Sequence, residues 1–325
     1  MPVSNIDTVW FVVLHYGPID KTVRCVDSLL RQEDVPGITS KVVIVENGYN
    51  ETRDSGLADR YGSSDEVILL ESAENLGFSG GNNLGYRYLK HRSPNNCSRT
   101  CAVFLNNDTE IPDGLFSEKL VGEYRHRPFD VLSPDVYDPA VRLHQSPLCR
   151  GQEIDRYAHE EFENARALLG EAYPMRMLHA CKNRCVALFG SFDHGRELIA
   201  EKRRRLAPSS DWQEPLDDVV PQGSAVIFGP AFLQKSDAAF DEVTFMYFEE
   251  CILKEKCDRL GLSIRYQPEL QVLHHHNEIT AQTLRSSTYQ KRRVQAQRTV
   301  DAYQSYLTYH RSQSRTDAAE TRSCS

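Results

Sequence analysis

The sequence contains no long apolar run, since no stretch approaches the roughly 18–20 residues that a membrane-spanning helix needs. Its amino terminus lacks the charged segment and small-residue cleavage site of a secretory signal, so we interpret the apolar residues there as a first strand. An excess of positive charge is also absent, because the net charge is −8, and this argues against wholesale nucleic-acid binding. We therefore expect a cytoplasmic protein without a nucleic-acid partner.

A disulfide framework is not expected, although the chain has nine cysteines, because such frameworks stabilise small secreted domains. Two cysteine pairs have the spacing C-x3-C, namely Cys97/Cys101 and Cys181/Cys185, and His179 lies close to the second pair. Either pair could form half of a zinc site, but the second half is missing. Reduced structural thiols are therefore the interpretation that we favour.

Four apolar runs in the first half of the chain alternate with helical patterns, and the runs end in polar residues. These runs are residues 9–16, 41–48, 66–72 and 101–111. Repeated strand–helix units of this kind predict an α/β fold with a Rossmann-like, mostly parallel central sheet and helices on both faces. Ligands bind beyond the carboxyl ends of the strands in such sheets, and the polar residues lie there.

A glycine-rich stretch, NLGFSGGNNLGY at residues 75–86, lies between the third apolar run and a helical pattern. Glycine permits a tight turn or a close approach of the backbone to a ligand. Free N–H groups at the start of a helix form an anion site. The stretch is thus a candidate phosphate-binding loop, and the alternative is a turn that merely starts a helix.

Residues 145–220 differ from the rest because they are highly charged and carry helical patterns without clear strand alternation. Their basic run, Lys202 to Arg205, fits a solvated helix face, with contact to anionic lipid headgroups as the alternative. Beyond this part, strands are expected at 223–229, 262–268 and 270–276, and a helix ends at Gly261. The tail predicts a long polar helix that frays after about Arg311.

With these pieces in order, the chain resembles the family 2 glycosyltransferases, especially their rhamnosyltransferase-like members, which have the GT-A fold. The motifs that carry the resemblance are VVLHYG, VIVENG, NLGFSGGNN, LNNDTEIPDG, SPDVYDP, FDEVTFMYFEE and PELQVLHHH. The resemblance covers residues 9–140 and 221–280 well, and the part between them poorly. It implies four parts: the nucleotide-sugar-binding half (1–144), a helical insertion or acceptor-side subdomain (145–220), the catalytic-base half (221–285), and a C-terminal helix with a flexible tail (286–325).

Family members transfer a sugar from a nucleoside diphosphate sugar with inversion. The resemblance implies dTDP-rhamnose or a UDP-sugar as the donor and a glycan or lipid-linked oligosaccharide as the acceptor, and it leaves a homodimer and peripheral contact with the inner face of the plasma membrane open. Tyr16 is expected near the base or ribose, and Glu46, where aspartate is usual, at the N3–H of uracil or thymine. Other residues implied at the donor are Asn47, Gly77, Gly80, Gly81, Asn82 or Asn83, Asn106 and Asn107.

The resemblance also implies a divalent ion, Mg²⁺ or Mn²⁺, bound to the donor diphosphate as a Lewis acid. Asp108 would hold it, as the lone carboxylate where the family has Asp-x-Asp or a reduced version. His274 would be the second protein ligand, and His276 is the alternative because both point to the same face of a strand.

Two consecutive glutamates stand where the family keeps a Glu-Asp pair at the start of a helix. The resemblance makes Glu250 the general base, although the family has aspartate there, and makes Glu249 the residue that orients the acceptor. Two glutamates at a helix start are otherwise ordinary complements to the helix dipole.

Two other functions remain open on the sequence. A sugar nucleotidyltransferase shares a GT-A-like core, but it normally carries a Gly-rich, Lys/Arg-bearing first loop, which HYGPIDKT does not match. A non-catalytic protein that binds nucleotide sugars would fit the departures at Asn106, Glu46 and Glu250 from the family pattern.

Overall fold

The computed structural model describes residues 6–48, 56–93, 96–140, 142–170, 213–275 and 288–323. The helices are α1 (Ile19–Leu30), α2 (Leu57–Tyr61), α3 (Gly77–Arg92), α4 (Phe116–His126), α5 (Ile154–Gly170), α8 (Pro230–Lys235), α9 (Glu249–Arg259) and α10 (Thr288–Ser323). The longer strands are β1 (Thr8–His15), β2 (Thr39–Asn47), β3 (Val67–Ser72), β4 (Thr100–Asn106), β6 (Val131–Asp138), β11 (Ala225–Phe228) and β12 (Ile264–His274). The two-residue strands are β5 (Thr109–Glu110), β7 (Leu143–His144), β8 (Cys149–Arg150), β9 (Leu216–Asp217) and β10 (Val219–Val220).

The central sheet has the strand order β3-β2-β1-β4-β11-β6-β12-β5, and the short strands β7 and β9 pair with β6 and β12. The pairs among β3, β2, β1 and β4 are parallel, as is the pair of β6 with β12. Strand β11 runs antiparallel to both β4 and β6. The carboxyl ends of β1, β2, β4, β6 and β12 therefore meet along one edge of the sheet.

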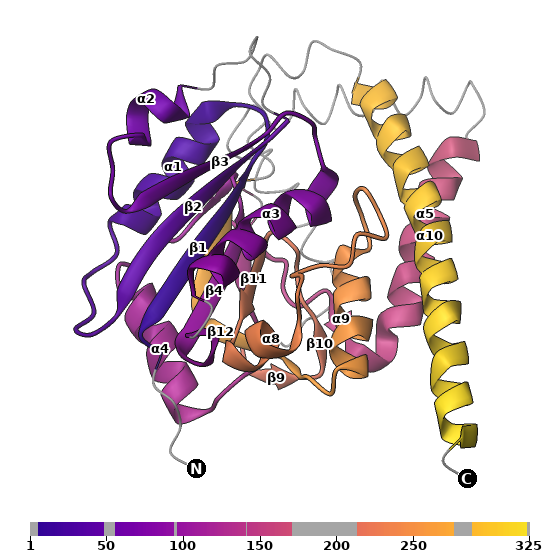
Figure 1. Ribbon diagram of the computed structural model, residues 1–325. Helices are drawn as coiled ribbons and strands as arrows, with labels where there is room; N and C mark the ends of the chain where they lie inside the picture. The colour runs from indigo at the N-terminus through magenta and orange to yellow at the C-terminus, as the bar shows by residue number, and fades with distance from the viewer. Residues whose placement is uncertain are drawn as a thin grey trace.

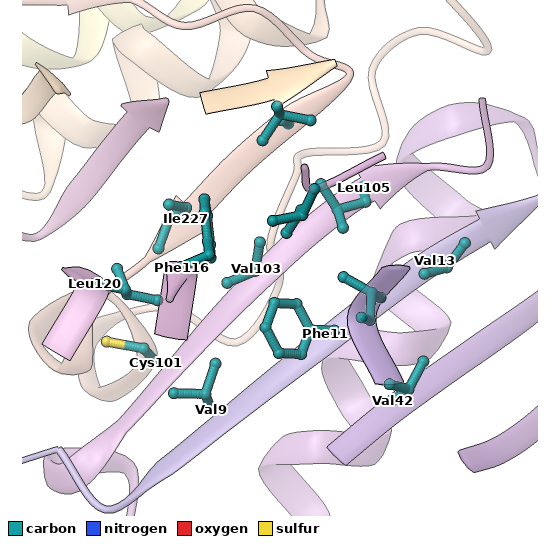
Figure 2. Packing of buried hydrophobic residues seen from close by; sticks show 14 of the residues in the cluster. Val9, Phe11, Val13, Val42, Cys101, Val103, Leu105, Phe116, Leu120 and Ile227 are labelled. Carbon is teal, nitrogen blue, oxygen red and sulfur yellow. The ribbon is translucent and has the colours of Figure 1, made fainter. Parts of the chain in front are cut away.

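Buried side chains on the two faces of the sheet pack against different helices (Figure 1). On one face, residues such as Phe11 and Val103 pack with α1, α2 and α4, and Figure 2 shows this cluster at close range. On the other face, residues such as Val12 and Phe104 pack with α3, α8 and α9. The α/β fold with helices on both faces of a mostly parallel sheet is thus confirmed.

A third apolar cluster lies outside the sheet, where α10 packs along α5 and α9 (Figure 1). Its buried members include Ala158 of α5, Ile252 of α9 and Tyr306 of α10. The long C-terminal helix predicted from the sequence is therefore held by the fold, and it continues to Ser323, beyond the point where we expected fraying. Within the described part of the chain, no helix is long and apolar enough to cross a membrane.

Two strand predictions were wrong in detail. The run 101–111 divides into β4 and β5, because a turn separates them and β5 pairs with β12 instead of continuing along β1. The two strands expected at 262–268 and 270–276 form the single strand β12, whose pairing with β6 shifts register between Gln267 and Gln271. The division into four parts stays a prediction. Of the expected insertion, residues 171–212 lie outside the described residues.

Most of the glycine-rich stretch is helical, because α3 begins at Gly77. Gly77 has a φ of 73°, and a Cβ atom there would collide with the carbonyl oxygen of Phe245. A Cβ on Gly81 would lie 2.5 Å from Leu14 Cδ1. Close packing of α3 on the sheet and on the 245 segment therefore accounts for these two glycines, and their expected donor-side role stays a prediction.

Replacing Gly81 by alanine should lower the free energy of unfolding by about 1–3 kcal/mol, as overpacking does, because the buried side chains of Leu14 and Asn47 or the helix itself must shift. Gly122 is the matched control, since it lies inside α4 and a Cβ there would have no neighbour within 4 Å. Gly122→Ala should stabilise the protein by about 0.4–1 kcal/mol. Urea denaturation of the two variants tests this, and equal effects would contradict the packing argument.

Candidate functional site

The expected donor residues lie at the carboxyl edge of the sheet, at the ends of β1, β2 and β4. His15 of β1 is the register partner of Glu46 on β2, and Leu14 is the partner of Asn106 on β4. Side chains alternate between the two faces of a strand. Since Ile44 belongs to the α1 face and Val45 to the α3 face, Glu46 lies on the α1 face and Asn47 on the α3 face.

Asn47 fixes the start of α3 through its side-chain amide. Its Nδ2 donates to the carbonyl oxygen of Gly77 at 2.9 Å and to Asn75 Oδ1 at 3.2 Å. Its Oδ1 accepts from the backbone N–H of Leu76 at 2.8 Å. The amide thus has partners on both of its polar atoms, and this position ties β2 to α3.

The two asparagines of the glycine-rich stretch have different surroundings. Asn83 Nδ2 donates to the carbonyl oxygen of Phe240 at 2.8 Å and to Glu242 Oε1 at 2.9 Å, so this side chain ties α3 to the 240–242 segment. Asn82 Nδ2 donates to the carbonyl oxygen of Phe78 at 3.1 Å. Among the described residues, Asn82 Oδ1 is buried and has no hydrogen-bond partner.

At the end of β1, a small polar network surrounds Thr22. Asn107 Nδ2 donates to Thr22 Oγ1 at 2.9 Å and to the carbonyl oxygen of Tyr16 at 3.2 Å. His15 Nδ1 lies 2.6 Å from the same hydroxyl, and burial lowers the pKa of His15. Glu46 is only 1% exposed beside this network, whereas Tyr16 is 55% exposed, so its ring is accessible to a ligand.

Asp108 and His274, which the resemblance to family 2 glycosyltransferases paired as metal ligands, lie close together. Asp108 Oδ1 is 3.4 Å from His274 Nε2, and its other oxygen is 3.4 Å from Lys21 Nζ. On the far side of the imidazole, His274 Nδ1 lies 2.7 Å from Gln145 Oε1. An amide oxygen accepts hydrogen bonds, so in the neutral tautomer whose Nδ1–H donates to Gln145, the Nε2 lone pair is directed at the carboxylate.

This donor set fits a divalent cation, because a carboxylate oxygen and an imidazole lone pair face each other with the ring oriented from behind. Among the described residues, no group of three or more His, Cys, Asp or Glu side chains could hold a metal ion. An ion at Asp108 and His274 would therefore need ligand atoms from a bound substrate as well.

Of the other cation ligands considered from the sequence, only the first cysteine pair lies among the described residues. Cys97 and Cys101 are free thiols, and burial raises the pKa of Cys101, as expected for a structural cysteine. The second cysteine pair with His179, the alternative ligand His276 and the basic run at 202–205 all lie outside the described residues.

Glu250 lies beside the end of β4. Its Oε1 accepts a hydrogen bond from the backbone N–H of Gly223 at 3.1 Å. The carbonyl oxygen of the next residue, Ser224, accepts from the N–H of Asn106 at 2.9 Å. Burial raises the pKa of Glu250, while hydrogen bonds from its own N–H and from Gly223 act in the opposite direction.

Glu249 is more deeply buried than its neighbour, with 4% of its surface exposed. Its Oε1 has no hydrogen-bond partner among the described residues. Burial, and to a lesser extent the charge of Glu250, raise the pKa of Glu249 to about 8. Burial thus raises the pKa of both carboxyl groups at the start of α9. They differ in their partners, because Glu250 accepts a hydrogen bond from Gly223 and Glu249 Oε1 accepts none from the described residues.

Three contributors to this site were missed by the sequence analysis. Lys21 at the start of α1 adds a cation beside Asp108, Gln145 orients His274, and the N–H of Gly223 holds Glu250. Lys21 lies in the HYGPIDKT segment, so a lysine just after the first strand was a usable signal. Gln145 and Gly223 offered none, because their roles come from tertiary contacts.

In a comparison with protein families, the family described as Glycosyl transferase family 2 matches residues 11–225 of this chain. A curated relative is the low-salt glycan biosynthesis hexosyltransferase Agl10 of Haloferax volcanii, which is 27% identical over 118 residues. The match covers 36% of this chain and 35% of that protein, so the chain spans about a third of this relative's length.

Two solved structures resemble the fold. One is GalNAc-T7 with UDP, GalNAc and Mn²⁺, with 12% identity and a TM-score of 0.48 over 90% of this chain and 47% of that chain. The other is S. aureus TarS 1-349 in complex with UDP, also with 12% identity and a TM-score of 0.48, over 82% of this chain and 60% of that chain.

Replacing Glu249 by glutamine should remove a pH dependence of stability. The pKa of Glu249 lies above that of an unfolded glutamate, so the folded state binds the proton more tightly, and the free energy of unfolding falls as the pH rises from about 4.5 to about 8. The difference in free energy of unfolding between the variant and the wild type should therefore be more favourable to the variant at pH 8 than at pH 5, by on the order of 1–3 kcal/mol.

Urea denaturation at both pH values measures this difference. Glu118→Gln is the control, because Glu118 is an exposed carboxylate in the first turn of α4 and should leave the profile unchanged. Parallel pH profiles for the wild type and Glu249→Gln would show that Glu249 is ionised in the folded protein.

Proposed function

Because this chain belongs to glycosyl transferase family 2, we propose that it transfers a sugar from a nucleoside diphosphate sugar to a hydroxyl group of a glycan or lipid-linked oligosaccharide. The configuration at the anomeric carbon is inverted in this reaction. The observation that carries the proposal is the meeting of Asp108 with His274 at one end of the sheet, with the Glu250 carboxylate held beside the end of the same strand β4.

The donor lies at the carboxyl edge of β1, β2 and β4. The exposed ring of Tyr16 packs on the base or ribose, and Glu46 accepts from the N3–H of uracil or thymine. The donor is dTDP-rhamnose or a UDP-sugar in this proposal. Support for a pyrimidine comes from the carboxylate at the end of β2, since a carboxylate accepts the N3–H that uracil and thymine both carry.

Negative charge on the diphosphate is balanced in two ways. Asp108 and His274 would hold Mg²⁺ or Mn²⁺, and the ion would supply Lewis-acid stabilisation of the leaving diphosphate. Lys21, which is 3.4 Å from Asp108, provides a second positive charge at the same place. Gln145 keeps the Nε2 atom of His274 directed at the site.

Glu250 acts as the general base. It removes the proton of the acceptor hydroxyl while the acceptor oxygen forms its bond to the anomeric carbon and the bond from that carbon to the diphosphate oxygen breaks. The N–H of Gly223 and the amino-terminal end of α9 favour the ionised form of Glu250. Glu249 carries a proton at neutral pH, so it can donate a hydrogen bond to the acceptor.

Replacing Asp108 by alanine should abolish the effect of Mn²⁺ on nucleotide binding, because one of two protein ligands is lost. Calorimetry of UDP or dTDP with and without Mn²⁺ measures this, and we expect a loss of about 100-fold or more in metal-assisted affinity. Glu110→Gln is the control, since Glu110 is a nearby carboxylate that contacts His275 and Arg31 instead. Wild-type Mn²⁺ dependence in Asp108→Ala would refute the metal assignment.

Replacing Glu250 by glutamine should lower kcat by about 10²–10⁴ while donor affinity stays nearly unchanged, because glutamine keeps the size but cannot take up a proton. The matched variant Glu249→Gln should lower kcat less, since Glu249 is already protonated. Transfer is measured with the donor that gives the largest thermal shift among UDP-, dTDP- and GDP-sugars. Near-normal turnover in Glu250→Gln, or a product of retained configuration, would overturn the mechanism.

A further inference from the structure

A strained turn directly precedes the two carboxylates of α9. Tyr247 has a φ of 79° and Phe248 a φ of 67°, so two successive residues with side chains adopt the left-handed conformation. Such conformations are unfavourable for L-residues other than glycine and persist only where the surroundings hold them. Phe248 is also the residue that caps the amino-terminal end of α9, so the turn sets the direction in which Glu249 and Glu250 enter the site.

The C-terminal helix α10 packs directly on this turn. Phe248 is only 5% exposed, and its ring lies 5.7 Å from the ring of Tyr306 in a nearly parallel stack, with 9° between the planes. The ring of Tyr303, one turn earlier on α10, is 5.6 Å from the same phenylalanine. Figure 1 shows α10 running alongside α5 and α9. Two aromatic residues of α10 thus enclose the second left-handed residue.

The same helix also holds the chain upstream of the turn. Tyr309 donates a hydrogen bond from its hydroxyl to Asp241 Oδ2 at 2.7 Å. Arg259 of α9 contacts both of these residues, at 2.9 Å from the tyrosine oxygen and 3.3 Å from the carboxylate. Arg298 lies over the ring of Phe245, at 5.9 Å from its centroid. The segment from 240 to 248, which we name the connecting segment, is therefore fixed on α10 at several points.

Helix α3 holds the connecting segment from the other side. The N–H of Phe78 donates to the carbonyl oxygen of Phe245 at 3.0 Å. Asn83 and Phe240 exchange two hydrogen bonds, of 2.8 and 3.1 Å. The connecting segment thus spans from the donor-side helix α3 to the helix that carries the carboxylates, and α10 supports it at the end that is strained.

We propose that α10 is a positioning element for the carboxylate pair: Tyr306 and Tyr303, acting through Phe248, keep the turn left-handed so that Glu250 faces the acceptor hydroxyl. This role rests on the proposed function. It adds to it, because the family match ends at residue 225 and covers neither the connecting segment nor α10. Neither tyrosine contacts the substrate in this proposal, so the effect of changing one should fall on turnover and spare donor binding.

The test compares three variants in the full chain. Tyr306→Leu keeps apolar bulk but removes the flat stacking surface, and it should lower kcat for transfer by about 10- to 100-fold, as small displacements of reacting groups do. Donor affinity by calorimetry should stay within twofold of wild type. Tyr306→Phe keeps the ring and should restore wild-type kcat. Leu120→Ala opens a cavity in the opposite face of the sheet, so it should lower the unfolding midpoint and leave kcat unchanged.

The outcomes separate this inference from the proposed function. If the wild type transfers sugar and Tyr306→Leu has a normal kcat, the positioning role of α10 is overturned and the proposed function is not. Equal losses in Tyr306→Leu and Leu120→Ala would also overturn it, because general destabilisation would then explain the effect. A wild type without transfer from any donor that binds would overturn both the proposed function and this positioning role. Loss of kcat in Tyr306→Leu, with rescue in Tyr306→Phe, supports the inference.

Discussion

Between β4 and β11, backbone hydrogen bonds join the two halves of the sequence. The last of them runs from the N–H of Asn106 to the carbonyl oxygen of Ser224, next to the residue that binds the Glu250 carboxylate. Because β11 is antiparallel to β4, its beginning lies at the same edge as the end of β4. The carboxylates of α9 and the turn that carries Asp108 therefore lie at the same edge of the sheet only while this pairing holds.

The arrangement of the strands was largely predictable, because runs such as 9–16 and 41–48 are apolar throughout, as buried parallel strands are. The start of α3 was not, since glycine disfavours a helix by its own propensity. Contact with Leu14 requires the helix to have a small residue there, and tertiary packing outweighs that propensity. Two strands were expected where β12 is unbroken, because the strand continues past Pro268 with a shift in its register against β6.

At the site, the sequence order of motifs was enough to nominate Asp108 with His274, which lie 3.4 Å apart, and the two glutamates of α9. Their protonation and support were not predictable. Gln145 reaches its partner across 129 residues of chain, so no local pattern marks it. Lys21 lies 87 residues from Asp108, and only its place just after the first strand could have suggested it. The raised pKa of Glu249 depends on burial, which the run of residues around it does not reveal. The roles of Tyr16, Glu46 and the asparagines stay predictions.

The end of β2 has a consequence for how such a protein can diverge. Glu46 and Asn47 are neighbours in sequence, yet the strand directs them to opposite sides of the sheet. Asn47 is engaged in anchoring α3, whereas Glu46 lies beside the polar network around Thr22. A substitution at Glu46 can therefore be selected without any effect on the contacts of Asn47, and the reverse also holds. An inserted or deleted residue in β2, in contrast, would exchange the two positions and disturb both at once.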